Sequence, residues 1–308
     1  MKKKLLITGS TGFVGKNLVE SYRDKYRLLL PNHYELDLLN KKDVQFYFQV
    51  HDDIDAIIHC ANYGGNRKTT PLPGQTLNEN LRMFFNIVEN KEQYSRLINL
   101  GSGAEYNKYR NLGGIKETEF GKHIPPDEYG FSKFIISNYI EKRMNMYSLR
   151  IFGLFGKYEE YEYRFISNAI VKNLLHMPIT IRQNVRFSWL YVDDLVKIID
   201  EFINLLPNHY DYNLTPPETT DLITIAETIN SLSDYPSEII VENKGYNFEY
   251  SGNNERLRKC MPDTSFTPMK TAIQEMFEYY IGILPEIETA TIYNDSYASR
   301  CTINPDGK

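Results

Sequence analysis

Three side chains have the types and positions needed for proton exchange in a catalytic site. Tyr129 and Lys133 form a Y-x-x-x-K unit within an expected helix over residues 127–144, so the lysine lies one turn beyond the tyrosine on the same face. A nearby ammonium favours phenolate, which predicts a tyrosine that exchanges a proton near neutral pH. Ser102 follows an apolar stretch over residues 95–101, which places its hydroxyl at the carboxyl edge of a sheet. We therefore predict that these three residues are catalytic; simple packing of the tyrosine on an amphipathic helix is the alternative.

A glycine-rich turn near the start of the chain supplies a second function. The segment T-G-S-T-G-F-V-G spans residues 8–15, between an apolar run at 4–7 and an expected helix at 13–24. Glycines at this spacing allow a tight turn, a close approach of backbone to phosphate, and close helix packing. The turn predicts a dinucleotide pyrophosphate site at the start of the helix. An ordinary strand–helix turn is the alternative. The predicted contacts are Gly9, Thr11, Gly12, Phe13, Val14 and Gly15.

The order of apolar and amphipathic segments predicts how these residues are held. In the first half, apolar strands alternate with amphipathic helices, which is typical of an α/β fold with a doubly wound parallel sheet. We expect residues 1–155 to form this dinucleotide-binding domain. Residues 156–285 have a mixed pattern and predict a smaller α/β substrate lobe, with the chain crossing between the two parts. Residues 286–308 have weak periodicity and receive no role from the sequence.

Composition excludes several other functions. The chain has 308 residues, 42% of them hydrophobic and 24% charged, which suits a globular protein with a full core. A formal net charge of −5 offers no basic footprint for nucleic acid. There is no apolar run of membrane-spanning length and no apolar region of the signal-peptide kind. The three cysteines are unclustered, so we expect neither a disulfide framework nor a metal site. We expect a cytoplasmic protein.

Taken together, these motifs resemble the extended branch of the short-chain dehydrogenase/reductase superfamily, the NAD-dependent epimerase/dehydratase enzymes of nucleotide-sugars. The resemblance is carried by the T-G-x-x-G-x-x-G turn, by Ser102 four residues before Tyr106, and by Tyr129 with Lys133. It covers roughly residues 3–283, a domain-scale match. It implies a Rossmann domain, a nicotinamide cofactor, a nucleotide-sugar substrate and a homodimer. In the implied mechanism Tyr129 transfers the proton, Lys133 lowers the tyrosine pKa and holds the nicotinamide ribose, and Ser102 binds the carbonyl oxygen.

Further cofactor contacts are implied by the same resemblance. The family segment that contacts adenine corresponds to Asp37 and Leu38, and the backbone of Cys60 and Ala61 corresponds to the lining of the cofactor site. Asn80 resembles the helix asparagine that helps to organise the lysine.

The end of the second strand bears on the choice of cofactor. An acidic residue there would favour NAD by binding the ribose 2′-hydroxyl. Here Leu28-Leu29-Leu30 is followed by Pro31-Asn32-His33, with no carboxylate before Glu35 and no arginine for a 2′-phosphate. We therefore expect NADP (NADPH) to be favoured over NAD, with Asn32 among the cofactor-binding residues.

On the substrate side, the resemblance implies that Arg186 binds the pyrophosphate and that Gly103, Ser102 and Tyr129 lie at the sugar. Gly153 stands where the family often has an asparagine after its fifth strand. The segment 157–165 is a candidate lid over the substrate, and a solvated loop is the alternative.

Residues beside the serine predict the type of reaction. Sugar 4,6-dehydratases carry an Asp-Glu pair after this serine, whereas this chain has Gly103-Ala104. The closest likeness is to reductases of the GDP-fucose synthase type, which epimerise through a cysteine two residues after the serine and a histidine in the lid. Ala104 occupies the cysteine position, and the segment 157–165 has no histidine.

We therefore expect NAD(P)H-dependent reduction of the C4 keto group of a nucleotide-linked 4-keto-deoxysugar, GDP- or CDP-linked, without epimerisation at C3 or C5. A 4-epimerase with tightly bound NAD is one alternative. A non-catalytic nucleotide-binding scaffold is another, from a different class.

Overall fold

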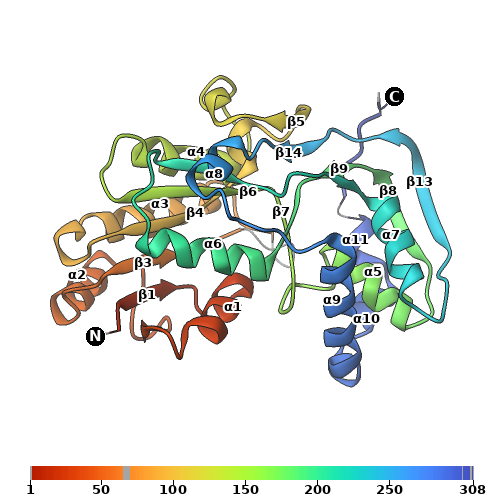
Figure 1. The fold of residues 1–308 in the computed structure, drawn as a ribbon, viewed down its shortest axis with the longest axis horizontal. Coiled ribbons are helices and arrows are strands. Elements are labelled where there is room, and N and C mark those ends of the chain that lie inside the picture. Colours follow the sequence, from red (N-terminus) through yellow and green to blue (C-terminus); the bar gives the residue numbers. More distant parts are fainter. Residues whose placement is uncertain (1, 65–69, 300, 306, 308) are drawn as a thin grey trace.

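A parallel six-stranded sheet forms the larger part of the molecule (Figure 1). The computed structural model describes residues 2–64, 70–299, 301–305 and 307. The strand order is β2-β1-β3-β4-β6-β11. It confirms the predicted α/β fold with a doubly wound parallel sheet. The strands are β1 (Lys4–Thr8), β2 (Arg27–Leu29), β3 (Ala56–His59), β4 (Leu97–Ser102), β6 (Met146–Ile151) and β11 (Asp211–Leu214).

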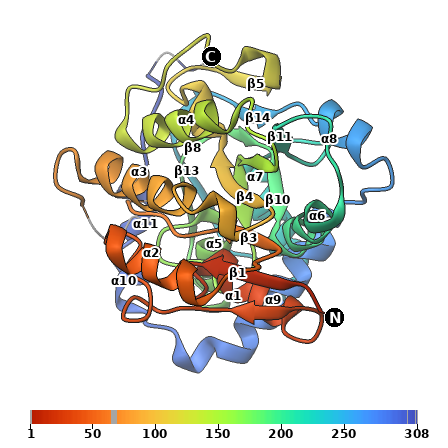
Figure 2. The ribbon, with the colours of Figure 1, turned by 90° about the vertical axis from the view of Figure 1, so that its left-hand side faces the viewer.

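Helices cover both faces of this sheet, because its central strands are apolar on both sides. In β1, Leu5 and Ile7 belong to one core and Leu6 to the other. Figure 2 shows α3 on one side of the sheet and α6 on the other. Full burial on both faces is the pattern expected of a parallel sheet. One face packs on α1 (Phe13–Tyr22) and α6 (Val192–Asn204), and the other on α2 (Lys41–Val50), α3 (Gln75–Val88) and α4 (Glu128–Ile140).

A smaller mixed lobe lies beside the sheet, on the right in Figure 1. Its core is formed mainly by helices packed on the strand pair β8–β13. The lobe contains α5 (Phe165–Leu174), β8 (Ile179–Asn184), α7 (Leu222–Ser231), β13 (Ile239–Tyr246) and α9 (Met269–Ile283). Because α6 packs on the six-stranded sheet and β11 is one of its strands, the chain crosses to the lobe, returns, and crosses again.

The C-terminal segment, for which no role could be predicted from sequence, packs on the lobe. It contains η4 (Leu284–Glu286), α10 (Ala290–Tyr293) and α11 (Ser296–Ser299). Ile287, Ile292 and Tyr297 are buried in the lobe core. Beyond them, Asn304 exchanges two hydrogen bonds with the buried Gln183 of β8, at 2.8 and 2.9 Å. This segment therefore completes the lobe.

Short strands that the sequence did not predict connect the two parts. A four-stranded sheet has the order β12-β9-β14-β5, and β10 pairs with β7. These strands are β5 (Leu112–Ile115), β7 (Gly153–Phe155), β9 (Arg186–Phe187), β10 (Trp189–Tyr191), β12 (Thr220–Asp221) and β14 (Tyr250–Gly252). The remaining elements are η1 (Lys91–Gln93), η2 (Gly103–Tyr106), η3 (Glu117–Glu119) and α8 (Glu255–Cys260).

The strand order places the functional edge of the sheet. The chain runs from β1 outward to β2 and then returns to the other side of β1, so the topological switch point lies between β1 and β3. Ligands of open α/β sheets bind outside the carboxyl ends of the strands at such a point. No helix in the described part of the chain is long and apolar enough to span a membrane.

Candidate active site

The glycine-rich turn joins β1 to α1 and leaves room for an anion at the helix N-terminus. Gly9 has φ +66°, and a Cβ there would lie 2.8 Å from the backbone nitrogen of Ala61. A Cβ on Gly15 would lie 2.2 Å from the Gly9 carbonyl oxygen, so α1 packs directly on the turn. Gly12 is the N-cap of α1 and makes no side-chain capping bond. This uncapped helix start, with Thr11, Phe13 and Val14 around Gly12, fits a dinucleotide pyrophosphate.

The loop after β2 brings the Glu35 carboxylate closer to Asn32 than its position in the sequence suggested. Asn32 Oδ1 accepts hydrogen bonds from the backbone nitrogens of Tyr34 and Glu35, at 2.8 and 3.2 Å. In return, Glu35 Oε2 accepts from the backbone nitrogen of Asn32 at 2.9 Å. A negative charge therefore lies at the end of β2, where the sequence indicated none. Further along, Asp37 accepts from the backbone nitrogen of Leu39 at 2.9 Å, and Leu38 is buried.

The end of β3 lies against β1 through a buried contact. His59 Nδ1 lies 2.9 Å from the Thr8 hydroxyl, and that hydroxyl accepts from the backbone nitrogen of Ala61 at 3.3 Å. Burial, and then the nearby Lys133, lower the pKa of His59 to about 3. Burial raises the pKa of Cys60 to about 12. Both side chains are therefore neutral at pH 7, and His59 supports the strand ends rather than carrying charge.

Asn80 on α3 is buried and bonded to the loop after β3. Its side chain accepts from the backbone nitrogen of Tyr63 at 2.8 Å and donates to the Tyr63 oxygen at 3.1 Å. It also donates to the Ser132 hydroxyl at 3.3 Å. Asn80 therefore links this loop to α4, the helix that carries Tyr129 and Lys133.

Ser102 ends β4 and begins the short helix η2 as its N-cap. The Ser102 hydroxyl accepts from the backbone nitrogen of Ala104 at 3.2 Å. Glu105 Oε1 reaches back to accept from the backbone nitrogen of Ser102 at 2.8 Å. These two bonds form a capping box. The S-x-x-E spacing that produces it is visible in the sequence, but that spacing alone predicts no function for Glu105.

Tyr129 is brought to Ser102 by close packing of α4 on η2. A Cβ on Gly130 would lie 2.9 Å from the Ala104 carbonyl oxygen, so only glycine allows this approach. Removal from water raises the pKa of Tyr129, and the Ser102 hydroxyl and the Arg164 guanidinium oppose that effect. Tyr129 therefore keeps its proton at neutral pH. The structure thus brings Ser102, Tyr129 and Lys133 together at the carboxyl edge of β4.

Lys133 is buried and its ammonium is held by β4. Nζ donates to the carbonyl oxygen of Leu100 at 2.8 Å and lies 5.9 Å from the centre of the Tyr129 ring. Burial lowers the pKa of Lys133 to about 8, against the opposing effect of Glu105. The expected lowering of the tyrosine pKa by Lys133 is not what the structure shows, because burial dominates at Tyr129 and the ammonium points to Leu100.

A second phenol, which was not predicted from the sequence, lies beside Ser102. Tyr250 of β14 places its hydroxyl 3.5 Å from the Ser102 hydroxyl, and burial raises its pKa. Gly103 makes this approach possible, since a Cβ there would lie 2.8 Å from the Tyr250 hydroxyl and 2.5 Å from Phe152. No periodicity marks Tyr250 in the sequence, because it comes from a three-residue strand 148 positions away from Ser102.

Arg186 lies on the lobe side, in an open cavity of about 390 Å³. Its guanidinium stacks over the Tyr246 ring, 5.2 Å from the ring centre. Phe248, Glu249 and Asn304 also line the cavity. Because β9 pairs with β14 at Phe187 and Tyr250, Arg186 and the phenol beside Ser102 lie on the same small sheet.

Packing explains why glycine occupies position 153, where the family often has an asparagine. A Cβ there would lie 2.8 Å from the Trp189 ring, and β7 pairs with β10 at this point.

The candidate lid that follows β7 is anchored at its start to α1, because Asn17 donates to the Lys157 carbonyl oxygen at 3.0 Å. Within it, burial raises the pKa of Glu159 to about 8, while Arg164 opposes the shift. Arg164 is therefore a cation that acts on both the lid and Tyr129.

The sequence matches the NAD dependent epimerase/dehydratase family over residues 5–214. The chain belongs to this family. The match covers the glycine-rich turn and the Ser-Tyr-Lys set. The protein is therefore an NAD(P)-dependent oxidoreductase of the nucleotide-sugar epimerase and reductase type. The described residues contain no group of side chains that could hold a metal ion.

Individual relatives and structural neighbours act on several nucleotide-sugars. GDP-L-colitose synthase of Yersinia pseudotuberculosis is 27% identical over 223 residues, which are 65% of this chain and 72% of that enzyme. The GDP-mannoheptose C4 reductase of Campylobacter jejuni, solved with NADP bound, has a TM-score of 0.78 at 18% identity, with 91% of this chain and 98% of that chain covered. The UDP-glucose 4-epimerase of Thermotoga maritima has a TM-score of 0.79 at 16% identity, with 91% and 99% covered. At these identities the structural likeness establishes the fold.

Proposed function

We propose that this protein reduces the C4 keto group of a GDP-linked 4-keto sugar with NADPH, without epimerising C3 or C5. The observation that carries the proposal is the meeting of Ser102, Tyr129 and Lys133 at one sheet edge, beside Ala104. The three polar side chains suit carbonyl reduction, whereas a methyl group stands where an epimerase of the GDP-fucose synthase type needs an acid or base.

The residues present fit a nicotinamide cofactor. The uncapped start of α1 and the close-packed turn at Gly9, Gly12 and Gly15 would hold the pyrophosphate. Asp37 and Leu38 would meet the adenine, and Lys133 the nicotinamide ribose. When bound, NADPH supplies the hydride.

The protonation states suit the direction of reduction. Tyr129 keeps its proton at neutral pH because removal from water raises its pKa, so it can act as the acid that protonates the C4 oxygen. The Ser102 hydroxyl, held by the backbone nitrogen of Ala104, would donate to the same oxygen as charge develops there. Lys133, with a pKa of about 8, is mostly an ammonium at neutral pH and can donate to a ribose hydroxyl.

The cavity at Arg186 supports a nucleoside diphosphate on the lobe side. A guanidinium can bind a pyrophosphate bidentately, and Tyr246 and Phe248 offer aromatic faces for a base. Glu249 adds a carboxylate, which can accept from the two neighbouring N–H donors on the edge of guanine. The relative named a GDP-L-colitose synthase agrees with GDP as the carrier.

The preference for NADPH over NADH is the finer part of the proposal. It rests on Asn32 and His33, which occupy the end of β2 in place of an acid. The Glu35 carboxylate beside Asn32 works against a 2′-phosphate, so the preference is expected to be modest.

The test is NADPH consumption with a GDP-linked 4-keto sugar, followed at 340 nm and confirmed by mass of the reduced product. A Ser102→Ala variant is the matched control. Consumption that depends on the keto sugar and drops in the control supports the proposal. A 4-epimerase is the alternative, since the same three residues serve both reactions and an epimerase shares the fold. Stoichiometric NAD in the purified protein, with no consumption of added NADPH, would favour it.

A further inference from the structure

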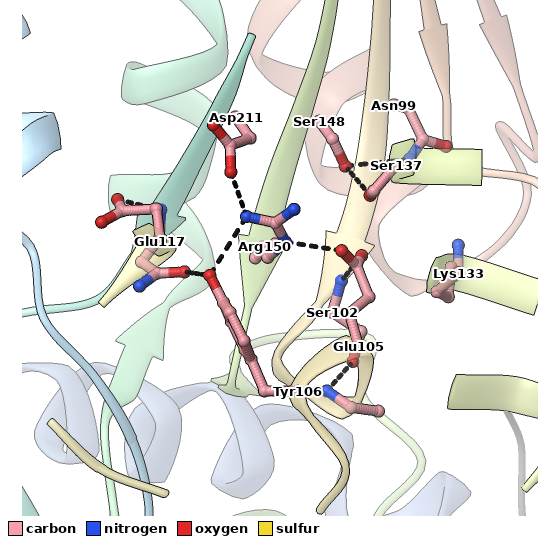
Figure 3. A network of polar contacts seen from close by, with 12 residues as sticks. Asn99, Ser102, Glu105, Tyr106, Glu117, Lys133, Ser137, Ser148, Arg150 and Asp211 are labelled. Carbon is pink, nitrogen blue, oxygen red and sulfur yellow. Dashed lines mark hydrogen bonds and ion pairs between the residues drawn. The ribbon is translucent and has the colours of Figure 1, made fainter. Parts of the chain in front are cut away.

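A buried ionic cluster lies beside Ser102 (Figure 3). Arg150 Nε donates to Glu105 Oε2 at 2.5 Å, and Arg150 also pairs with Asp211 and donates to the Tyr106 hydroxyl. Glu105 is 0% exposed and Arg150 1%. Buried charges are tolerated only when they are paired and hydrogen-bonded, so each is confined to one position.

The second oxygen of Glu105 connects this cluster to the catalytic serine. Oε1 accepts from the backbone nitrogen of Ser102 at 2.8 Å. Gly101 leaves the space for it, because a Cβ at that position would lie 2.6 Å from Oε1. The main chain that carries Ser102 is therefore held by a carboxylate whose own position is set by Arg150 and, through Arg150, by Asp211.

Glu105 and Lys133 both contact the end of β4, since Glu105 accepts from the backbone nitrogen of Ser102 and Lys133 donates to the carbonyl oxygen of Leu100. The titratable groups that face Lys133 are His59 and Cys60 at the end of β3, Tyr129 on its own helix, and Glu105 on η2. His59 and Cys60 are neutral at pH 7, since their pKa values lie at about 3 and about 12. Tyr129 is neutral because burial raises its pKa. Among the described residues, Glu105 is therefore the neighbouring anion that favours the ammonium form of Lys133.

We propose that Glu105 is a positioning residue of this active site, which orients Ser102 through its main chain and places a negative charge beside the end of β4 that also holds Lys133. The proposal rests on the proposed function, because it assumes that Ser102 and Lys133 serve carbonyl reduction. Glu105 itself does not touch the reacting atoms. It acts through the two residues that do.

The test compares Glu105→Gln with Glu117→Gln as a matched control. Glu117 is also buried and lies at the edge of the same cluster, but it accepts from the backbone nitrogen of Asn213 at 3.0 Å rather than from Ser102. For each protein we would measure kcat, KM and the NADPH dissociation constant between pH 6.5 and 9.5, together with the melting temperature.

We expect kcat of Glu105→Gln to fall on the order of 10- to 100-fold. A substitution away from the reacting atoms that displaces a catalytic group, here the Ser102 hydroxyl, can reduce the rate by that factor. The pH dependence gives the second readout. Removing the anion removes the effect that raises the pKa of Lys133, so the lysine loses its proton at a lower pH. The basic limbs of kcat and of NADPH affinity should both move to lower pH. Glu117→Gln should leave both limbs in place.

A merely structural role would lower the melting temperature of both variants alike and leave the limbs unmoved, and that result would overturn the proposal. If Glu105→Gln does not fold, Glu105→Asp is the second variant. It keeps the charge on a shorter arm, so we expect a reduced kcat with an unmoved basic limb. Wild-type kcat in Glu105→Asp would likewise overturn the proposal. If the wild type reduces no keto sugar, the proposed function fails, while the pH limb of NADPH affinity still tests Glu105.

Discussion

Gly12 and Gly15 lie three positions apart in the same turn, and we predict opposite consequences when they are substituted. Gly12 has φ −80° and ψ 178°, which any residue can adopt, and a Cβ there would meet only the Gly9 oxygen at 3.4 Å. The backbone at Gly12 therefore accepts a side chain. A Cβ on Gly15 would lie 2.2 Å from the Gly9 oxygen and 2.6 Å from Ser10 Cα.

The magnitudes follow from these contacts. Aspartate is a better N-cap than glycine by a few tenths of a kcal/mol, so Gly12→Asp should change the melting temperature by less than about 1 °C. Overpacking costs about 1–3 kcal/mol. At about 2.1 cal/mol/K per residue, 308 residues unfold with an entropy of roughly 650 cal/mol/K, so Gly15→Ala should lower the melting temperature by about 2–5 °C.

Cofactor affinity should follow the reverse order. The Gly12→Asp carboxylate would fill the anion site and cap the helix N–H groups itself. Hydrogen bonds to charged groups are worth about 1.5–3 kcal/mol, so the NADPH dissociation constant should rise on the order of 10- to 100-fold or more. Gly15→Ala should lose less affinity while it stays folded. Differential scanning fluorimetry with and without NADPH measures both quantities. Wild-type affinity in Gly12→Asp, or an unchanged melting temperature in Gly15→Ala, would refute the reasoning.

Three further predictions concern the chemistry. Tyr129→Phe should reduce turnover on the order of 100-fold or more and leave the NADPH dissociation constant nearly unchanged, because the ring stays and the proton goes; turnover close to wild type would make Tyr129 a packing residue. Glu35→Gln should increase the preference for NADPH over NADH in kcat/KM, and Asn32→Asp should decrease it, because each changes the charge beside the ribose; a wild type that prefers NADH would show that Glu35 decides the cofactor. Reduction in deuterated water should leave C3 and C5 free of enzyme-dependent deuterium, since Ala104 cannot exchange a proton; incorporation at either carbon, read by NMR, would exclude a simple reductase.

The parallel sheet and its glycine-rich turn could be predicted from sequence because their signals are local. The runs at β1, β3 and β4 are apolar on both faces, which is the pattern of a strand buried between two layers. The turn needs glycine at position 9 for its positive φ and at position 15 for close packing, and both needs can be read from the residue type at those positions. Helix ends were less predictable: α4 ends at Ile140, four residues before the expected end at 144.

The remaining parts of the site depend on long-range contacts with no local pattern. Tyr250 reaches Ser102 from a three-residue strand, too short for any periodicity. Glu35 lies three residues after Asn32 in the sequence, yet the loop between them folds the Glu35 carboxylate back to the backbone nitrogen of Asn32. Glu105 was marked locally by a capping box, but its charge partners Arg150 and Asp211 come from β6 and β11. Their meeting depends on strand order, which spacing within a motif cannot supply.

The protonation of Tyr129 shows how far the Y-x-x-x-K motif alone can be taken. Four-residue spacing fixes the face that Tyr129 and Lys133 share, but not the direction in which the ammonium points. In the structure Nζ donates to the Leu100 oxygen, and removal from water raises the tyrosine pKa. The tyrosine is then a proton donor at neutral pH rather than a phenolate. A donor is what the C4 oxygen requires as hydride arrives, whereas oxidation of an alcohol requires the base. A protonated Tyr129, which the motif alone did not predict, is therefore compatible with the proposed reduction.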